Sequence, residues 1–294
     1  DISLRVGRTE LPVFLFSDSI KVGYTYPWLR PPVELYSLLP NTQSDGADAS
    51  YRMHAGDVSN TLEGNFGNTA QGVPHDRGTA YGNDSLSISD TIEYRSFTFR
   101  VSYERARLTL SAFDPFLNLF KLFGSQGIAL ADKYNSDSKI ATLEVISASY
   151  DPGRWFVISE LGHAYYNSIL GESTAGYVSA GYRVAAFTPF ITYAQETAVG
   201  NFDPGLNLTG LPPALMAMGA GLNAGLNALL ESIPASRTVS VGMRWDFMKN
   251  LDLKVQVDHM RLGSDSFGTL INIQPGYPPG GTVNLFGVAI NLVF

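Results

Sequence analysis

The sequence contains no cysteine, which excludes a disulfide framework, a thiolate nucleophile and a cysteine-ligated zinc site. Charged residues are also scarce, at 16% of the 294 residues against about 25% in a typical soluble domain. The net charge of −7 and the lack of a basic stretch argue against a nucleic-acid partner. The histidines at positions 54, 75, 163 and 259 have no metal-ligand spacing, and no G-x-S-x-G motif occurs. We therefore expect no metal, no cofactor and no enzymatic activity.

Alternation of apolar and polar residues runs through the whole chain. In residues 239–247, valine, methionine, tryptophan and phenylalanine alternate with serine, glycine, arginine and aspartate. Residues 251–258 repeat the pattern after the turn-like pair Lys249-Asn250, and the chain ends with alternating apolar residues from Phe286 to Phe294. A period of two predicts extended strands with one continuous apolar face.

Short and long connections alternate between the predicted strands. The hairpin turns are predicted at residues 57–59, 104–105, 151–153, 185–186 and 249–250. Long loops are predicted at residues 9–47, 68–89, 114–138, 198–235 and 263–281, and only the link at 167–173 is short. Long structureless loops are uncommon in compact soluble domains, whereas transmembrane β-barrels combine short periplasmic turns with long extracellular loops. We therefore predict an all-β fold, a closed antiparallel transmembrane β-barrel of about twelve strands that forms a single domain over residues 1–294.

One apolar stretch, residues 211–230, is long enough to be tested as a membrane-spanning helix. A proline pair, two asparagines and the lack of flanking lysine or arginine argue against a spanning helix. We predict a partly helical, extracellular loop at this position.

Two stretches carry a resemblance to a known family. The apolar alternation that closes on Phe294 resembles the assembly signal of Gram-negative outer-membrane barrels. The stretch VGRTELPVFLFSDSIKVGYTYPWLRPPVELY, residues 6–36, resembles a segment of porin-like outer-membrane proteins of proteobacteria. The resemblance implies a sixteen-stranded pore whose first strands precede this sequence. It also implies a homotrimer in the outer membrane of a Gram-negative bacterium, in contact with outer-membrane lipid and lipopolysaccharide.

Charged residues on the polar registers are the candidate pore lining. If the apolar registers face lipid, these side chains face a wet lumen, where they set ion selectivity. The alternative is that they form cross-strand pairs that only stiffen the wall. The predicted pore-lining residues are Arg5, Arg52, Arg100, Arg183, Arg244, Lys254, Glu63, Glu144, Glu160, Asp246 and Asp258.

The loop at residues 9–47 is the candidate constriction. Several prolines stiffen it, and it carries both charged and aromatic side chains. We predict that it folds into the lumen; the alternative is an extracellular cap that never enters the barrel. The predicted constriction residues are Asp18, Lys21, Arg30, Glu34, Tyr24, Tyr26 and Trp28.

The function predicted from these features is passive diffusion of small polar solutes or ions through an outer-membrane porin. Two alternatives arise from the apolar loop at residues 211–233. The first is a scaffold, sheath or export barrel that binds a partner protein or polymer. The second is a channel for hydrophobic substrates. Liposome swelling separates the three, because polar sugars or ions pass only through the first kind.

Overall fold

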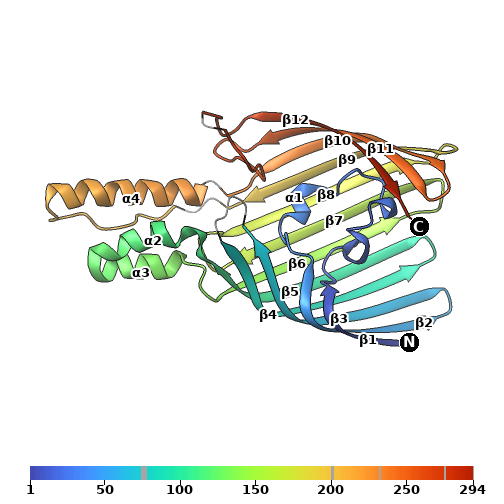
Figure 1. Cartoon of the computed structure of the whole chain (residues 1–294), viewed down its shortest axis with the longest axis horizontal. Helices are drawn as coiled ribbons and strands as arrows, with labels where there is room; N and C mark the ends of the chain where they lie inside the picture. The colour runs from blue at the N-terminus through green and yellow to red at the C-terminus, as the bar shows by residue number, and fades with distance from the viewer. Residues whose placement is uncertain (74–77, 200–201, 232, 275, 294) are drawn as a thin grey trace.

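The computed structural model describes residues 1–73, 78–199, 202–231, 233–274 and 276–293. In these residues, twelve antiparallel strands form one sheet whose spatial order follows the chain (Figure 1). The strands are β1 (Ile2–Glu10), β2 (Gln43–Ala55), β3 (Val58–Gly72), β4 (Thr79–Tyr94), β5 (Phe97–Leu110), β6 (Lys139–Tyr150), β7 (Trp155–Tyr166), β8 (Glu172–Tyr182), β9 (Phe187–Ala198), β10 (Ser236–Met248), β11 (Leu251–Leu262) and β12 (Thr282–Leu292).

The convex face of the sheet is apolar. Val241 of β10 lies opposite Ile191 of β9 and Val257 of β11, and these three side chains are 55%, 55% and 48% exposed. Similar rows of exposed apolar residues follow the other strands, on most of them in the register that the alternating pattern predicts. An apolar surface of this extent in water would drive association, so it requires an apolar medium outside the sheet.

Two of the predicted connections are wrong. Residues 68–89 are not a long loop, because β3 continues to Gly72 and β4 begins at Thr79. Residues 104–105 are not a turn, because β5 runs without interruption from Phe97 to Leu110. The hairpin turn in this region lies at residues 95–96, between β4 and β5. The prediction missed β4 and divided β5 into two strands. These two errors cancel, so the predicted count of twelve strands agrees with the sheet.

The predicted closed barrel is not formed by the described residues. Within them, β1 pairs with β2 alone and β12 pairs with β11 alone, so the sheet is curved but has two edges. The outward side chains at these edges are strongly exposed, with Val6 at 89% and Phe286 at 74%. The twelve strands therefore cover only part of a circumference.

The two ends of the sheet differ. One end carries short turns at residues 56–57, 95–96, 151–154, 183–186 and 249–250, and we call it the short-turn end. The other, the long-loop end, carries a helical projection made of α2 (Asp114–Phe120), α3 (Gly124–Tyr134) and α4 (Pro213–Glu231) (Figure 1). Leu222, Leu226 and Leu230 of α4 are buried in one cluster with Leu117 and Phe120 of α2.

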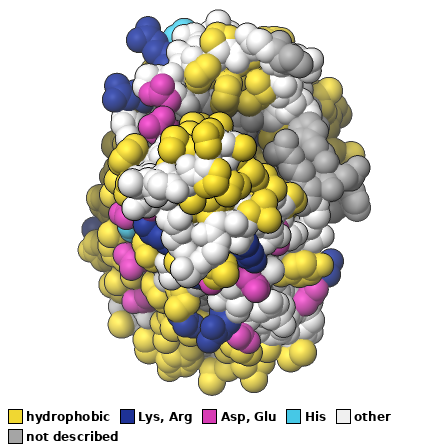
Figure 2. Space-filling view, turned by 90° about the vertical axis from the view of Figure 1, so that its left-hand side faces the viewer, with side chains coloured by type: hydrophobic (Ala, Val, Ile, Leu, Met, Phe, Trp, Pro, Cys, Tyr) yellow, Lys and Arg dark blue, Asp and Glu magenta, His cyan; other side chains and the backbone are white. Residues whose placement is uncertain are grey.

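Helix α4 is the one helix in the described residues that is long and apolar enough, by length and composition, to cross a membrane. Only 22% of its most apolar window is buried. Its outer side exposes Leu215, Met216 and Met218, and hydrophobic side chains gather where the molecule is viewed from the helical end (Figure 2). The helix lies in the connection between β9 and β10 and packs on α2, so within this structure it is part of a loop.

Asp203 fastens the chain that leads into α4 to helix α3. Its carboxylate accepts hydrogen bonds from Lys133 Nζ and Tyr134 Oη, both at 2.6 Å, and from the backbone N–H of Gly205 at 2.8 Å. Burial alone would raise the pKa of Asp203, but the hydrogen bonds from Lys133 and Tyr134 hold that pKa below its ordinary value. The carboxylate therefore stabilises the projection in its ionised form.

We expect Asp203→Asn to loosen the helical projection by about 1–2 kcal/mol, because one charge-assisted contact is lost. Limited proteolysis should cleave the projection several-fold faster in this variant. Asp132→Asn, at an exposed position of α3, is the control and should leave the cleavage rate unchanged. The pKa of Asp203 is depressed, so its contribution is present above about pH 4 and is lost as the pH falls through the folded-state pKa. Equal cleavage of the two variants at pH 7 would contradict this role.

Candidate functional site

Residues 11–42, which we call the inner segment, connect β1 to β2 but do not cover the rim. They lie across the concave face of the sheet (Figure 1). The segment contains the short helices η1 (Ser17–Ser19), η2 (Gly23–Thr25) and α1 (Val33–Tyr36). Its prolines and turns leave many backbone groups without helix or strand partners, and the wall of the sheet satisfies several of them.

An apolar core lies between the inner segment and the wall. Phe14, Trp28 and Leu35 of the segment are almost fully buried. They belong to one cluster with wall residues, among them Val145 of β6 and Phe190 of β9. This part of the concave face is therefore dry.

Trp28 is the largest buried side chain of this core. Its indole Nε1–H donates to Ser179 Oγ at 2.8 Å and to Thr192 Oγ1 at 3.0 Å, and its ring meets Tyr177 edge-on at a centroid distance of 5.5 Å. A buried indole N–H requires an acceptor, and the hydroxyls of β8 and β9 supply two. The hydrogen bonds orient the ring, and the ring closes the space above these strands.

Two cations of the wall hold the tip of the inner segment. Lys254 of β11 is 1% exposed and donates through Nζ to the backbone carbonyls of Gly23, Tyr26 and Trp28. Arg244 of β10 donates to the carbonyl of Tyr24 at 2.5 Å, and its guanidinium lies 4.3 Å from the centre of the Tyr24 ring. The segment is therefore attached to the wall through its main chain.

Glu160 of β7 is a second attachment point and is 1% exposed. It accepts hydrogen bonds from the backbone N–H of Leu15 at 2.8 Å and from Tyr36 Oη at 2.8 Å, both in the inner segment. It also accepts from Tyr177 Oη at 2.8 Å and Ser147 Oγ at 2.7 Å in the wall. Four donors thus stabilise a buried carboxylate that has no cationic partner among the described residues.

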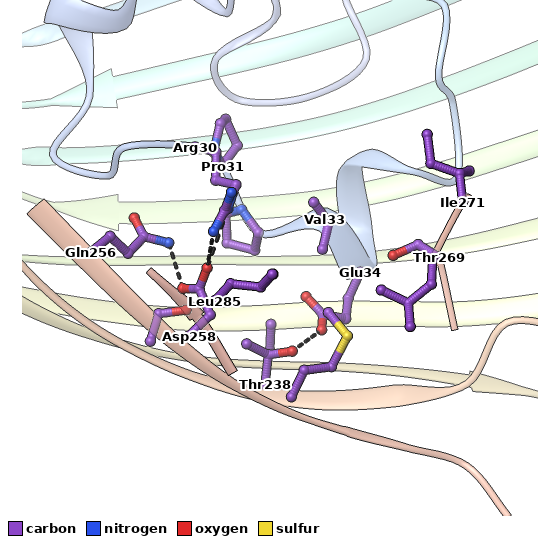
Figure 3. Close-up of a pocket in the computed structure, with 15 residues that line it drawn as sticks. Arg30, Pro31, Val33, Glu34, Thr238, Gln256, Asp258, Thr269, Ile271 and Leu285 are labelled. Carbon is purple, nitrogen blue, oxygen red and sulfur yellow. Dashed lines mark hydrogen bonds and ion pairs between the residues drawn. The ribbon is translucent and has the colours of Figure 1, made fainter. Parts of the chain in front are cut away.

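The part of the inner segment around Arg30 and Glu34 is attached to β10 and β11 by an ion pair and by hydrogen bonds, as the close-up shows (Figure 3). Arg30 pairs with Asp258 of β11 at 2.5 Å, and Gln256 donates to the same carboxylate at 2.7 Å. Glu34 points the other way, into β10, and accepts from the hydroxyls of Thr238 and Ser236. A cavity of about 240 Å³ remains between this part of the segment and the loop after β11.

The predicted pore-lining charges fall into two groups. Arg100, Glu160, Lys254 and Asp258 are buried and bind the inner segment. Arg100 and Lys254 donate to backbone carbonyls of the segment. The others lie in the inward register or at strand ends and form ion pairs: Arg5 with Asp48, Arg52 with Glu93, Glu63 with Arg100, Asp246 with Arg244, and Arg183 with Asp151. Of these, Arg244 also donates to the inner segment.

Glu144 is the one pore-lining prediction that the structure contradicts. It lies on the convex face of β6, opposite Tyr103 of β5 and His163 of β7, and it is exposed. The inward positions beside it are Leu143 and Val145, which are buried in the apolar core. Because the inner segment makes this part of the concave face dry, the apolar residues turn inward there and the acid turns outward.

Some inward-facing charges stay solvated near the β1 edge and the short-turn end, whereas the inward serines of β4, at positions 85, 87 and 89, are buried. The side chains of Arg5 and Arg52 are 54% and 50% exposed there. Asp18 of the segment is exposed and lies close enough for its charge to act on Arg5 and Glu63. Lys21, also exposed, lies 3.6 Å from Glu10. Charges of both signs thus lie close together on this part of the concave face.

The inner segment also separates two cavities. The cavity toward the short-turn end has a volume of about 380 Å³ and is lined by Arg183, Arg244, Asp151 and Asp246. The cavity toward the long-loop end has a volume of about 500 Å³ and is mainly apolar. Two acids of the second cavity, Glu104 and Glu196, were missed from the sequence, although Glu196 shares the inward register of Thr192.

Phe294, the predicted assembly signal, and His75 lie outside the described residues. Among the residues that are described, no group of three or more His, Asp and Glu side chains is placed to hold a metal ion.

No protein-family model matches the chain, and no curated protein matches it by sequence. Solved structures do match. The anion-selective porin from Comamonas acidovorans has a TM-score of 0.56 at 10% identity, covering 99% of this chain and 74% of the porin. OmpF of Salmonella typhi, in complex with daunomycin, has a TM-score of 0.55 at 12% identity with the same coverages. OmpT of Vibrio cholerae has a TM-score of 0.52 at 11% identity, covering 99% of this chain and 76% of OmpT.

These matches extend over almost the whole chain, and at such low identity they define the fold alone. The fold is that of a porin-like outer-membrane β-barrel.

Proposed function

We propose that the protein is an outer-membrane porin of a Gram-negative bacterium, a passive diffusion channel for small polar solutes or ions. The observation that carries this proposal is the inner segment, which fills part of the concave face while Arg5 and Arg52, on the inward register of β1 and β2, stay solvated. Hydrated wall charges of both signs suit solutes that keep part of their water shell. The convex apolar face would then contact outer-membrane lipid and lipopolysaccharide.

The proposal includes a closed pore. The two unpaired edges at β1 and β12 require further strands between them, because an unpaired backbone edge cannot face lipid. The chain covers 74% of two matched porins, close to the three quarters that twelve strands would form in a barrel of sixteen. We infer four further strands on the N-terminal side, long loops outside the cell and Phe294 as the assembly signal. A trimer form of OmpT supports a homotrimer.

The function is tested by conductance of the purified protein in planar bilayers and by liposome swelling with sugars of increasing size. We expect a stable ion conductance and swelling that falls with solute size. A folded, membrane-inserted protein that conducts no ions would refute the proposal.

The solvated arginines should set ion preference, because low-dielectric walls focus the field of charges in a narrow pore. We expect Arg5→Glu/Arg52→Glu to shift the reversal potential in a salt gradient toward cation preference. Arg95→Glu is the matched control, since Arg95 lies in an exposed turn with a 69% exposed side chain. An unchanged reversal potential in the double variant would place the ion path elsewhere in the lumen.

A further inference from the structure

The cavity toward the long-loop end combines an apolar lining with buried acids. Its wall includes Leu38 of the inner segment, Leu108 and Leu110 of β5, and Ile233 before β10. Its volume of about 500 Å³ is within the range of sites that bind small organic molecules. A hydrated ion or a sugar would gain nothing from so apolar a lining.

Two carboxylates face this cavity, Glu104 from β5 and Glu196 from β9. They are 4% and 3% exposed. Glu104 accepts hydrogen bonds only from the neighbouring hydroxyls of Ser85 and Ser87 in the described structure. One carboxylate oxygen of Glu196, Oε2, is buried and has no hydrogen-bond partner there.

No cation among the described lining residues balances these acids. The described residues that line the cavity include no lysine, arginine or histidine. Elsewhere on the concave face acids do have cations, as in the pairs of Arg100 with Glu63 and Arg30 with Asp258. A buried carboxylate without a cation or a full set of donors is costly, so the arrangement favours a positively charged occupant.

We propose that this cavity binds an organic cation with an apolar body, an amphipathic amine, on its way through the channel. The ammonium group donates to the free oxygen of Glu196, and Glu104 is a second carboxyl group of the same cavity. The apolar body packs against the leucine-rich lining. The passage of the amine through the protein rests on the proposed channel function, whereas its binding requires only the cavity.

The test uses 4-phenylbutylamine, with 4-phenylbutanol as its uncharged analogue. Two measurements are made: calorimetric titration of the detergent-solubilised protein, and interruption of the potassium chloride current in planar bilayers. We expect the amine to bind and to interrupt the current, and the alcohol to bind about tenfold more weakly or less.

The variant Glu196→Gln keeps the shape of the side chain but removes its charge. We expect it to weaken amine binding by about tenfold and to leave alcohol binding unchanged. Glu172→Gln, at a glutamate of β8 whose side chain lies beside His163, is the control and should bind the amine as the wild type does. Unfolding curves of both variants verify that each is folded.

The outcomes separate this inference from the channel function. Equal binding of amine and alcohol, or equal amine binding by wild type and Glu196→Gln, would overturn the cation site while leaving the conductance intact. Amine binding by a protein that conducts no ions would support the site and refute the channel.

Discussion

Replacing Lys254 by methionine is expected to release the tip of the inner segment and to raise the single-channel conductance. Methionine fills nearly the same volume but donates no hydrogen bond, so the carbonyls of Gly23, Tyr26 and Trp28 lose their shared donor. Each buried carbonyl left without a donor costs about 1–3 kcal/mol, and the three together should cost about 3–5 kcal/mol. The tip should then leave the wall and take up water.

Planar-bilayer recordings check this expectation. The Lys254→Met channel should show a larger and noisier current than the wild type, because the obstruction becomes mobile. Lys249→Met is the control, since Lys249 lies in the exposed turn between β10 and β11. A Lys254→Met channel with wild-type conductance and noise would mean that the tip is held by other contacts.

Replacing Glu160 by leucine should have the largest effect on stability. The change leaves the N–H of Leu15 and the hydroxyls of Tyr36, Tyr177 and Ser147 without their acceptor, at the centre of the apolar core. Four buried donors without partners should cost about 4 kcal/mol or more. Glu160→Gln keeps one acceptor oxygen at the same place and should cost roughly half as much.

Thermal unfolding in detergent, followed by circular dichroism, measures the series. We expect the midpoint to fall in the order wild type, Glu160→Gln, Glu160→Leu. If Glu160→Leu cannot be refolded, the glutamine variant still tests the idea. A wild-type midpoint for Glu160→Gln, together with an unchanged conductance, would show that Glu160 does not hold the segment.

The alternating pattern predicted the faces of most strands, because one face meets an apolar medium and the other does not. Strand β4 was missed for a physical reason. Its inward positions include Ser85, Ser87 and Ser89, and its first half contains the run Gly82-Asn83-Asp84, a sequence typical of turns and loops. The outward residues Leu86 and Ile88 did carry the alternation, and they were the available signal.

The contents of the lumen could not be predicted in the same way. The pattern identified Lys254 as an inward-facing charge, but its partners are backbone carbonyls more than 200 positions away, and no residue type encodes them. The inner segment also makes part of the wall dry, so the inward side of β6 became apolar and Glu144 was assigned to the wrong face. In that region, the polarity of a side chain alone does not tell whether it faces the lumen or the lipid.

Both ends of the inner segment lie side by side, because Glu10 of β1 pairs directly with Gln43 of β2. A turn of a few residues could therefore join the two strands without changing the register of any ladder. The length of the inner segment can therefore change without any change in the strand pairing. Because the segment also buries apolar and charged residues of the wall, a replacement of residues 11–42 would have to supply equivalent contacts to give a channel of another diameter on the same sheet.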